Sequence, residues 1–248
     1  MAKFFEIKNK TPTSADLYFY GDIVSDTWGK WTDEDKCPQD IIDMLHECGD
    51  VEELNIYINS GGGSVWGGVA IYNILRRFNA KKTVHIDGVA ASIASVIALS
   101  GDKIIMPKNS FLMIHKAMTS AFGNADELRS IAESLETIEK SIINTYMENA
   151  IDGIEESFIK EMMSAETWLT AEDAEKLFKN IEVTDSVEAV ACISDYRYKK
   201  APGSVFASKR KEKTPSPKPR DDEFRKAESR LRKLKNFIFE EEYKNDNE

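Results

Sequence analysis

Strand-like and helix-like patterns alternate along the first 190 residues, and this alternation constrains the fold more than any other feature. Runs rich in β-formers or alternating in polarity predict strands, at 15–24, 52–60, 81–88, within 102–115 and in 181–193. Apolar residues at helical spacing predict helices, at 38–48, 65–78, 90–100, 124–150, 157–164 and 169–178. Repeated strand, turn and helix units of this kind predict an α/β layered fold.

The longest predicted helix, 124–150, has a well-defined start. Asn124 is a capping residue, and Glu127 three positions later completes a capping box. The helix then keeps a 3.6-residue apolar period through Leu128, Ile131, Leu135, Ile138, Ile142 and Tyr146. Helix 169–178 is predicted to begin in a similar way, with Thr170 as the cap and Asp173 at the capping-box position.

The charge is unevenly distributed. The formal net charge is −10, but residues 199–248 carry 15 basic and 10 acidic side chains, so the first 198 residues carry about −15. An acidic body argues against nucleic acid as a partner, because phosphate contacts dominate such binding. The stretch 199–220 is rich in Pro, Ser and Lys, which predicts a flexible linker between a domain at 1–198 and the remainder.

Residues 221–248 predict a charged helical tail. A heptad seam of about two repeats runs through Phe224, Ala227, Leu231, Leu234 and Ile238. A seam this short is not stable alone, so it needs a partner helix or surface. A solvated tail without any partner is the alternative interpretation.

Several protein classes are excluded by composition. The longest uncharged apolar stretch, 89–100, is too short to cross a bilayer, and the first ten residues are too charged for a signal peptide. We therefore expect a cytoplasmic protein with no membrane partner. Cys37, Cys48 and Cys192 are odd in number and lack CxxC spacing, so we expect partly buried free thiols and neither disulfides nor a metal site.

Three short stretches carry residues suited to chemistry. The sequence INSGGGSV at 58–65 could bring backbone amides close to a ligand because glycine has no Cβ, although, taken alone, three glycines favour a flexible turn. Ser92 lies among small residues at the start of a predicted helix, where a capping role is the alternative. His115 ends the apolar strand FLMIH and is suited to act as a general base.

Taken together, these stretches resemble the Clp proteolytic-subunit family of serine peptidases. The motifs INSGGGSVWGGVAIYN, GVAASIAS, FLMIHKA and ETWLTAEDAEKL follow one another in the order of that family and cover residues 15–185. The chain is most similar to the phage and prophage head-maturation proteases of this fold. The resemblance implies the Clp peptidase/crotonase-like layered fold, with the long helix protruding from it.

The resemblance also implies the roles of individual residues. Ser92 matches the nucleophile and His115 the base, while Gly63 and Ile93 would give oxyanion amides, with Gly62 beside them in the substrate-binding turn. Glu166 occupies the position of the family aspartate, so its longer side chain changes the reach to the imidazole. Asp173 and Asp185 are fallback candidates for this acid.

A further departure follows His115. The family has proline and a glycine pair in the segment that binds substrate as an added strand, whereas this chain has Ala117, Met118, Thr119 and Ser120.

The implied protein is a homo-oligomeric ring, with two rings of seven as one arrangement. It would cleave proteins or peptides, either capsid and scaffold proteins of a phage head or substrates delivered by an ATPase unfoldase. No nucleotide-binding motif is present, so any ATP use would come from a partner, and we expect no cofactor. Two alternatives remain: a crotonase-like enzyme acting on acyl-CoA thioesters, and a non-catalytic scaffold that binds through its tail.

Overall fold

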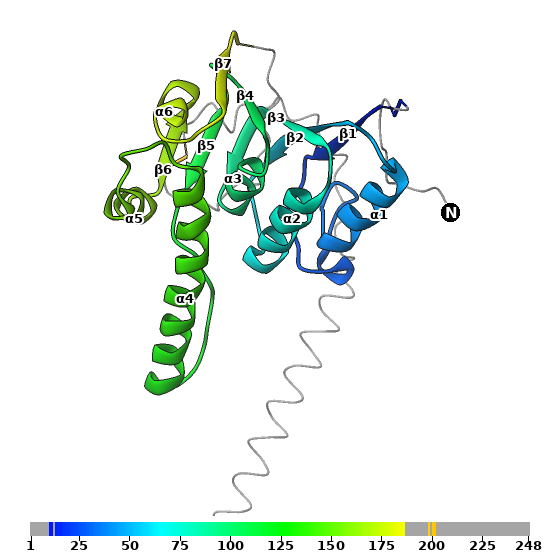
Figure 1. Ribbon diagram of the computed structural model, residues 1–248. Coiled ribbons are helices and arrows are strands. Elements are labelled where there is room, and N and C mark those ends of the chain that lie inside the picture. The colour runs from blue at the N-terminus through cyan, green and yellow to red at the C-terminus, as the bar shows by residue number, and fades with distance from the viewer. Residues whose placement is uncertain (1–9, 12, 187–197, 199, 202–248) are drawn as a thin grey trace, which may run out of the picture. The chain divides into compact units, whose positions relative to one another are not determined.

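A mixed sheet forms the centre of the protein, as seen in the computed structural model, which describes residues 10, 11, 13–186, 198, 200 and 201 (Figure 1). Its strands within these residues are β1 (Ser14–Phe19), β2 (Glu53–Ser60), β3 (Lys81–Ala91), β4 (Lys103–Pro107), β5 (Phe111–Ile114), β6 (Thr167–Thr170) and β7 (Ile181–Thr184). Parallel pairing gives the order β1-β2-β3-β4-β7. The C-terminal half of β3 also pairs with β5, which pairs antiparallel with β6.

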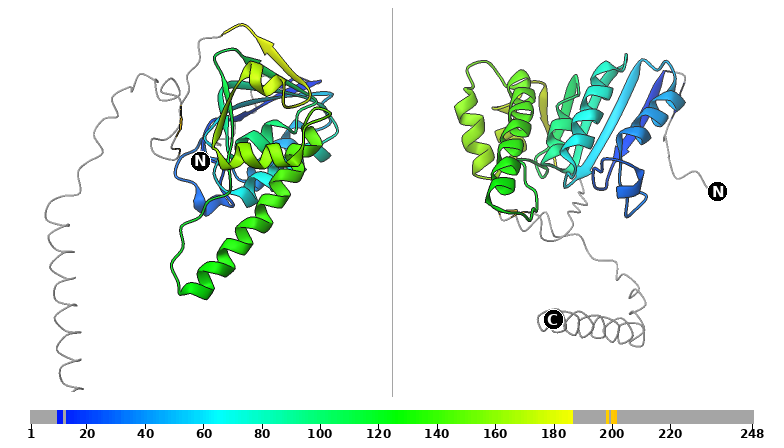
Figure 2. Two further views of the ribbon diagram at one scale, coloured as in Figure 1. Left: turned by 90° about the vertical axis from the view of Figure 1, so that its left-hand side faces the viewer. Right: turned by 90° about the horizontal axis from the view of Figure 1, so that it is seen from below.

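The helices are α1 (Pro38–Cys48), α2 (Val65–Arg77), α3 (Ile93–Ala98), α4 (Ala125–Asn149), α5 (Glu156–Ser164) and α6 (Ala171–Glu175), with one 3-10 turn, η1 (Thr27–Gly29). Helices α1, α2 and α3 cover one face of the sheet (Figures 1 and 2). Alternate strand residues such as Leu17, Ile56 and Val84 are fully buried beneath them. Their neighbours Tyr18, Tyr57 and His85 stack ring on ring on the opposite face, as the period of two in a strand requires.

Helix α4 extends beyond the sheet (Figure 1). Asn124 accepts hydrogen bonds from Asp126 N and Glu127 N, and Glu127 bonds back to the Asn124 amide, so the predicted capping box is confirmed. Only three α4 residues near its C-terminal end are buried: Ile142, Ile143 and Tyr146. The apolar residues of its first turns remain partly or largely exposed, with Leu128 43% exposed.

The structure confirms the predicted α/β layered fold and most of its elements, and it corrects three of them. The helix predicted at 90–100 starts only at Ile93, because Ala90 and Ala91 extend β3 and pair with β5. The strand predicted at 15–24 ends at Phe19, and the helix predicted at 169–178 is strand β6 followed by the shorter α6. Thr170 does cap that helix by accepting from Asp173 N.

Other sequence predictions concern residues that the structure leaves undescribed. Apart from residues 200 and 201, the linker at 199–220 and the tail at 221–248 lie outside the described residues, as do Cys192 and the end of the strand region 181–193. Cys37 and Cys48 are buried free thiols. Within the described residues, no helix is both long and apolar enough to span a membrane, and no cluster of His, Cys, Asp and Glu side chains forms a metal site.

Candidate active site

Ser92 lies in a tight turn between β3 and α3. Its φ of +57° falls in the left-handed region, which non-glycine residues rarely adopt unless the surrounding structure enforces it. Two hydrogen bonds hold this conformation: the Ser92 amide donates to Met113 O at 2.9 Å, and the Ser92 carbonyl accepts from the Ser95 hydroxyl at 2.6 Å. The small residues Ala90, Ala91 and Ala94 are buried around it, so the turn exposes the Ser92 hydroxyl while its backbone stays fixed.

His115 follows the last residue of β5, and its ring is directed at this hydroxyl. His115 Nε2 lies 2.7 Å from Ser92 Oγ, which is a hydrogen bond between residues 23 positions apart. Burial lowers the pKa of His115, and the nearby charge of Glu166 partly offsets that effect by raising it. The imidazole is therefore neutral near pH 7 and able to accept the serine proton.

The glycine turn after β2 packs against the same point. Gly62 has φ +87°, and a Cβ there would lie 2.8 Å from Ser92 Cβ and 3.2 Å from the Ile93 nitrogen. Gly63 has φ +149°, and within the described residues its amide donates to no other group. The Ile93 amide is the first of α3, where no carbonyl of the same helix can accept it. The amides of Gly63 and Ile93 thus lie in the two turns that meet at Ser92, the glycine turn and the first turn of α3.

Glu166 lies beside His115 because of strand pairing. The antiparallel register of β5 and β6 ends at Ile114 opposite Thr167, so the next residues on each side are His115 and Glu166. Glu166 Oε1 accepts from the Lys200 amide at 2.7 Å and from Trp168 Nε1 at 3.5 Å. Its charge still acts on the imidazole, as the pKa of His115 shows.

The two fallback carboxylates have other partners. Asp173 accepts a hydrogen bond from the Thr170 hydroxyl at 2.8 Å at the start of α6. Asp185 pairs with Lys108 at 3.1 Å, and its side chain is almost fully exposed. Among these three carboxylates, Glu166 is the one whose charge raises the pKa of His115.

Ser92 and His115 line a cavity of about 820 Å³. One wall is the loop at 22–35, and the other is the segment at 117–120 that follows His115. A second, much smaller pocket of about 10 Å³ adjoins Ser92 and is lined chiefly by apolar side chains, including Val65, Val96 and Ile142. The site is thus a cleft lined by the half-buried Ser–His pair.

Two contributors to this cleft are not apparent from the sequence. The loop at 22–35 has no periodic pattern, and the only available signal was a pair of tryptophans close together in a polar stretch, Trp28 and Trp31. Tyr198 donates a hydrogen bond to the Gly61 carbonyl, and its ring packs edge-on against His115 with centroids 5.4 Å apart. No local pattern marks a residue that reaches the site from so far along the chain.

The fold and the cleft together define a class: layered α/β proteins with a Ser–His pair at the carboxyl ends of parallel strands. The chain belongs to the Clp protease family, whose sequence signature matches residues 33–177, more than half of its length. The family resemblance drawn from the motifs is therefore confirmed.

Curated relatives carry the name ATP-dependent Clp protease proteolytic subunit. The chain is 28% identical to the Bacteroides fragilis protein over 128 residues, which cover 50% of this chain and 60% of that one. It is 34% identical to the Ligilactobacillus salivarius protein over 126 residues, covering 50% and 62%. For subunit 1 of Salinibacter ruber the values are 30% over 138 residues, covering 53% and 57%. The chain thus spans about 60% of the length of the curated relatives it matches.

Proposed function

We propose that the protein is a serine endopeptidase in which Ser92 is the nucleophile and His115 the general base. The observation that carries this proposal is the 2.7 Å contact between Ser92 Oγ and His115 Nε2, both of which line the cleft. The strained backbone of Ser92 supports it, since strain of this kind is retained where function requires it. The family to which the chain belongs is one of proteases.

The proposed reaction is acyl transfer. His115 takes the Ser92 proton as Oγ attacks a peptide carbonyl, and the developing oxyanion accepts hydrogen bonds from the Gly63 and Ile93 amides. His115 then gives the proton to the leaving amine, and water hydrolyses the acyl-enzyme with the same base. Each preorganised amide contributes about 3–4 kcal/mol in the transition state. Glu166 stabilises the imidazolium through its charge, which already raises the pKa of His115.

An extended peptide fits between the two walls of the cleft. Gly63 and the segment 117–120 line the cavity, and their backbone groups are the ones proposed to pair with a substrate strand. The small pocket beside Ser92 has apolar walls, which favours an apolar side chain next to the scissile bond. Its volume of about 10 Å³ means that Val65 and Ile142 must move to admit one.

The proposed assembly is a homo-oligomeric ring, stacked on a second ring through α4. Support comes from the exposed apolar residues in the first turns of α4, such as Leu128 and the half-buried Ile131 and Leu135. An apolar stripe of this kind on a helix that leaves the body needs a partner. The ring size of seven rests on the family resemblance.

The substrates are proposed to be proteins of the host cytoplasm or of a phage prohead. Similarity to phage head-maturation proteases in the serine, histidine and ETWLTA motifs supports capsid or scaffold processing. An ATPase unfoldase as partner is supported by the names of the bacterial relatives. One assay separates these two uses. A subunit that works with an ATPase should cleave a folded substrate only when the ATPase is added, whereas a head-maturation protease should cleave its substrate without it.

Hydrolysis of a fluorogenic peptide and of casein tests the peptidase activity. We expect Ser92→Ala to lower kcat by at least about 10³-fold while the assembly keeps its size. Ser100→Ala is the matched control, because the Ser100 hydroxyl is buried and has no hydrogen-bond partner among the described residues. Equal activity of Ser92→Ala and the parent protein would refute the assignment and favour a scaffold role.

A further inference from the structure

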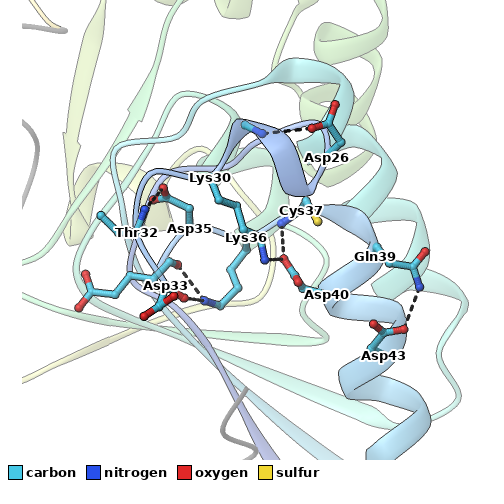
Figure 3. Close-up of polar contacts among 12 residues, drawn as sticks. Asp26, Lys30, Thr32, Asp33, Asp35, Lys36, Cys37, Gln39, Asp40 and Asp43 are labelled. Atoms are coloured by element: carbon cyan, nitrogen blue, oxygen red, sulfur yellow. Dashed lines mark hydrogen bonds and ion pairs between the residues drawn. The ribbon is translucent and has the colours of Figure 1, made fainter. Parts of the chain in front are cut away.

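The loop at 22–35, here called the cleft loop, is held rigid by a polar network (Figure 3). Asp35 is 6% exposed, and its carboxylate accepts from the amides of Asp22 at 2.9 Å, Trp31 at 2.9 Å and Thr32 at 3.0 Å. Lys36 Nζ donates to the carbonyls of Asp33 and Glu34 at 3.0 and 2.9 Å. A buried carboxylate with three backbone donors fixes the path of the loop.

The cleft loop is also hydrogen-bonded to the glycine turn that follows β2. The Ile23 amide donates to Gly62 O at 2.9 Å, and the Ile23 carbonyl accepts from Ser64 N at 2.7 Å. The hydroxyls of Ser25 and Ser64 lie 2.5 Å apart. These bonds fix the backbone of the cleft loop relative to the glycine turn that packs against Ser92.

Two tryptophans of this rigid loop lie in solvent. Trp28 and Trp31 are each 96% exposed, although tryptophan is usually among the more buried side chains. Only Trp31 lines the cavity that contains Ser92 and His115. Asp35 holds the Trp31 backbone amide, so the position of this residue at the cleft wall is fixed by its backbone.

The cleft wall is also negatively charged. The described residues that line the cavity include Asp22, Asp26 and Asp35 and neither lysine nor arginine. Burial alone would raise the pKa of Asp35, but the hydrogen bonds from Trp31, Asp22 and Thr32 outweigh it and lower that pKa, so the carboxylate stays ionised. An aromatic face beside fixed negative charge is the environment that a guanidinium or ammonium group prefers.

We propose that Trp31 is a specificity-determining residue that binds a lysine or arginine side chain of the substrate close to the scissile bond. The inference rests on the proposed peptidase function and adds a substrate class to it. The indole face receives the cation, and the carboxylates of the cleft loop attract it. Trp31 lines the larger cavity and not the small apolar pocket beside Ser92, so the two preferences are proposed for different substrate positions.

The test uses pairs of fluorogenic peptides that differ only by arginine or citrulline, placed in turn at each of the four positions nearest the scissile bond. Citrulline keeps the shape of arginine and removes its charge. We expect kcat/KM to favour arginine by at least about 5-fold at one position, and Trp31→Ala to reduce that ratio by about 2- to 5-fold. Trp28→Ala is the matched control, because it removes an equally exposed tryptophan of the same loop that does not line the cavity.

Binding of the same peptides to Ser92→Ala, followed by fluorescence anisotropy, gives a readout that does not require turnover. If neither peptide is hydrolysed by the parent protein, the peptidase proposal fails, while a binding preference for arginine that Trp31→Ala removes would still support this inference. A parent protein without an arginine preference at any position would overturn the inference. So would an arginine ratio that Trp31→Ala leaves unchanged, or one that Trp28→Ala lowers equally.

Discussion

Replacing Gly63 with alanine tests whether catalysis requires the close approach of the glycine turn to Ile23 and Ser92. A Cβ on Gly63 would lie 2.0 Å from the Ile23 carbonyl oxygen and 2.9 Å from its carbonyl carbon, so the backbone has to move. The φ of +149° adds strain for any L-residue, of about 1–3 kcal/mol. The turn and its amide will therefore be displaced from the Ser92 hydroxyl.

The expected consequence is loss of one oxyanion donor. We expect kcat for peptide hydrolysis to fall by about 10²–10³, which corresponds to about 2.7–4 kcal/mol of transition-state stabilisation. Steady-state kinetics on a fluorogenic peptide measures this loss, and urea unfolding of the same variant measures how far the turn is destabilised.

Gly153→Ala is the control for backbone strain without a clash. Gly153 has φ +95°, nothing lies within 4 Å of a Cβ there, and the residue follows α4 away from the cleft. This variant should lose about 1–3 kcal/mol of stability and keep kcat within about 2-fold. A folded Gly63→Ala variant with kcat within about 3-fold of the parent would refute the role given to the Gly63 amide.

Four further predictions concern the imidazole and the assembly. The kcat/KM of the parent protein should rise with pH around a midpoint below about 6.5, the ordinary pKa of histidine, because burial lowers the pKa of His115 and only its neutral form accepts the serine proton. Glu166→Gln should shift this midpoint to lower pH, because it removes the charge that raises the pKa of His115. Tyr198→Ala should shift the midpoint to higher pH, because water then reaches the His115 ring. Equal midpoints in the parent protein and both variants would contradict the roles given to Glu166 and Tyr198. Replacing Leu128 and Leu135 together with glutamate should halve the assembly mass measured by light scattering and leave each ring intact, and an unchanged mass would refute stacking through α4.

The local parts of the fold were predictable from the sequence because short-range signals specify them. The capping box of Asn124 and Glu127 marks the start of α4, and Pro38 marks the start of α1. The helix boundary at 90–100 was wrong because alanine favours helix by itself, whereas here Ala90 and Ala91 are held in β3 by pairing with β5. Tertiary pairing of this kind leaves no trace in local propensity.

The candidate site was predictable only in part, for a similar reason. Ser92 and His115 stand out through their small or apolar neighbours and lie in the family motifs, and the structure brings their side chains into contact. The cleft loop depends on Asp35 and on the pairing of Ile23 with Gly63, which joins residues 40 positions apart. Tyr198 reaches the site from outside the matched family region. Long-range contacts such as these become visible only once the chain is folded.

Labelling by a fluorophosphonate, read by intact mass and peptide mapping, tests most directly whether Ser92 and His115 form an activated pair. The account predicts one adduct per chain on Ser92, no adduct in Ser92→Ala, and much slower labelling of His115→Ala. His85→Ala should label normally, because His85 is also partly buried with a lowered pKa but stacks on Tyr57 away from the cleft. An assembled protein that takes up no label, or a Ser92→Ala variant that labels as fast as the parent, would contradict it.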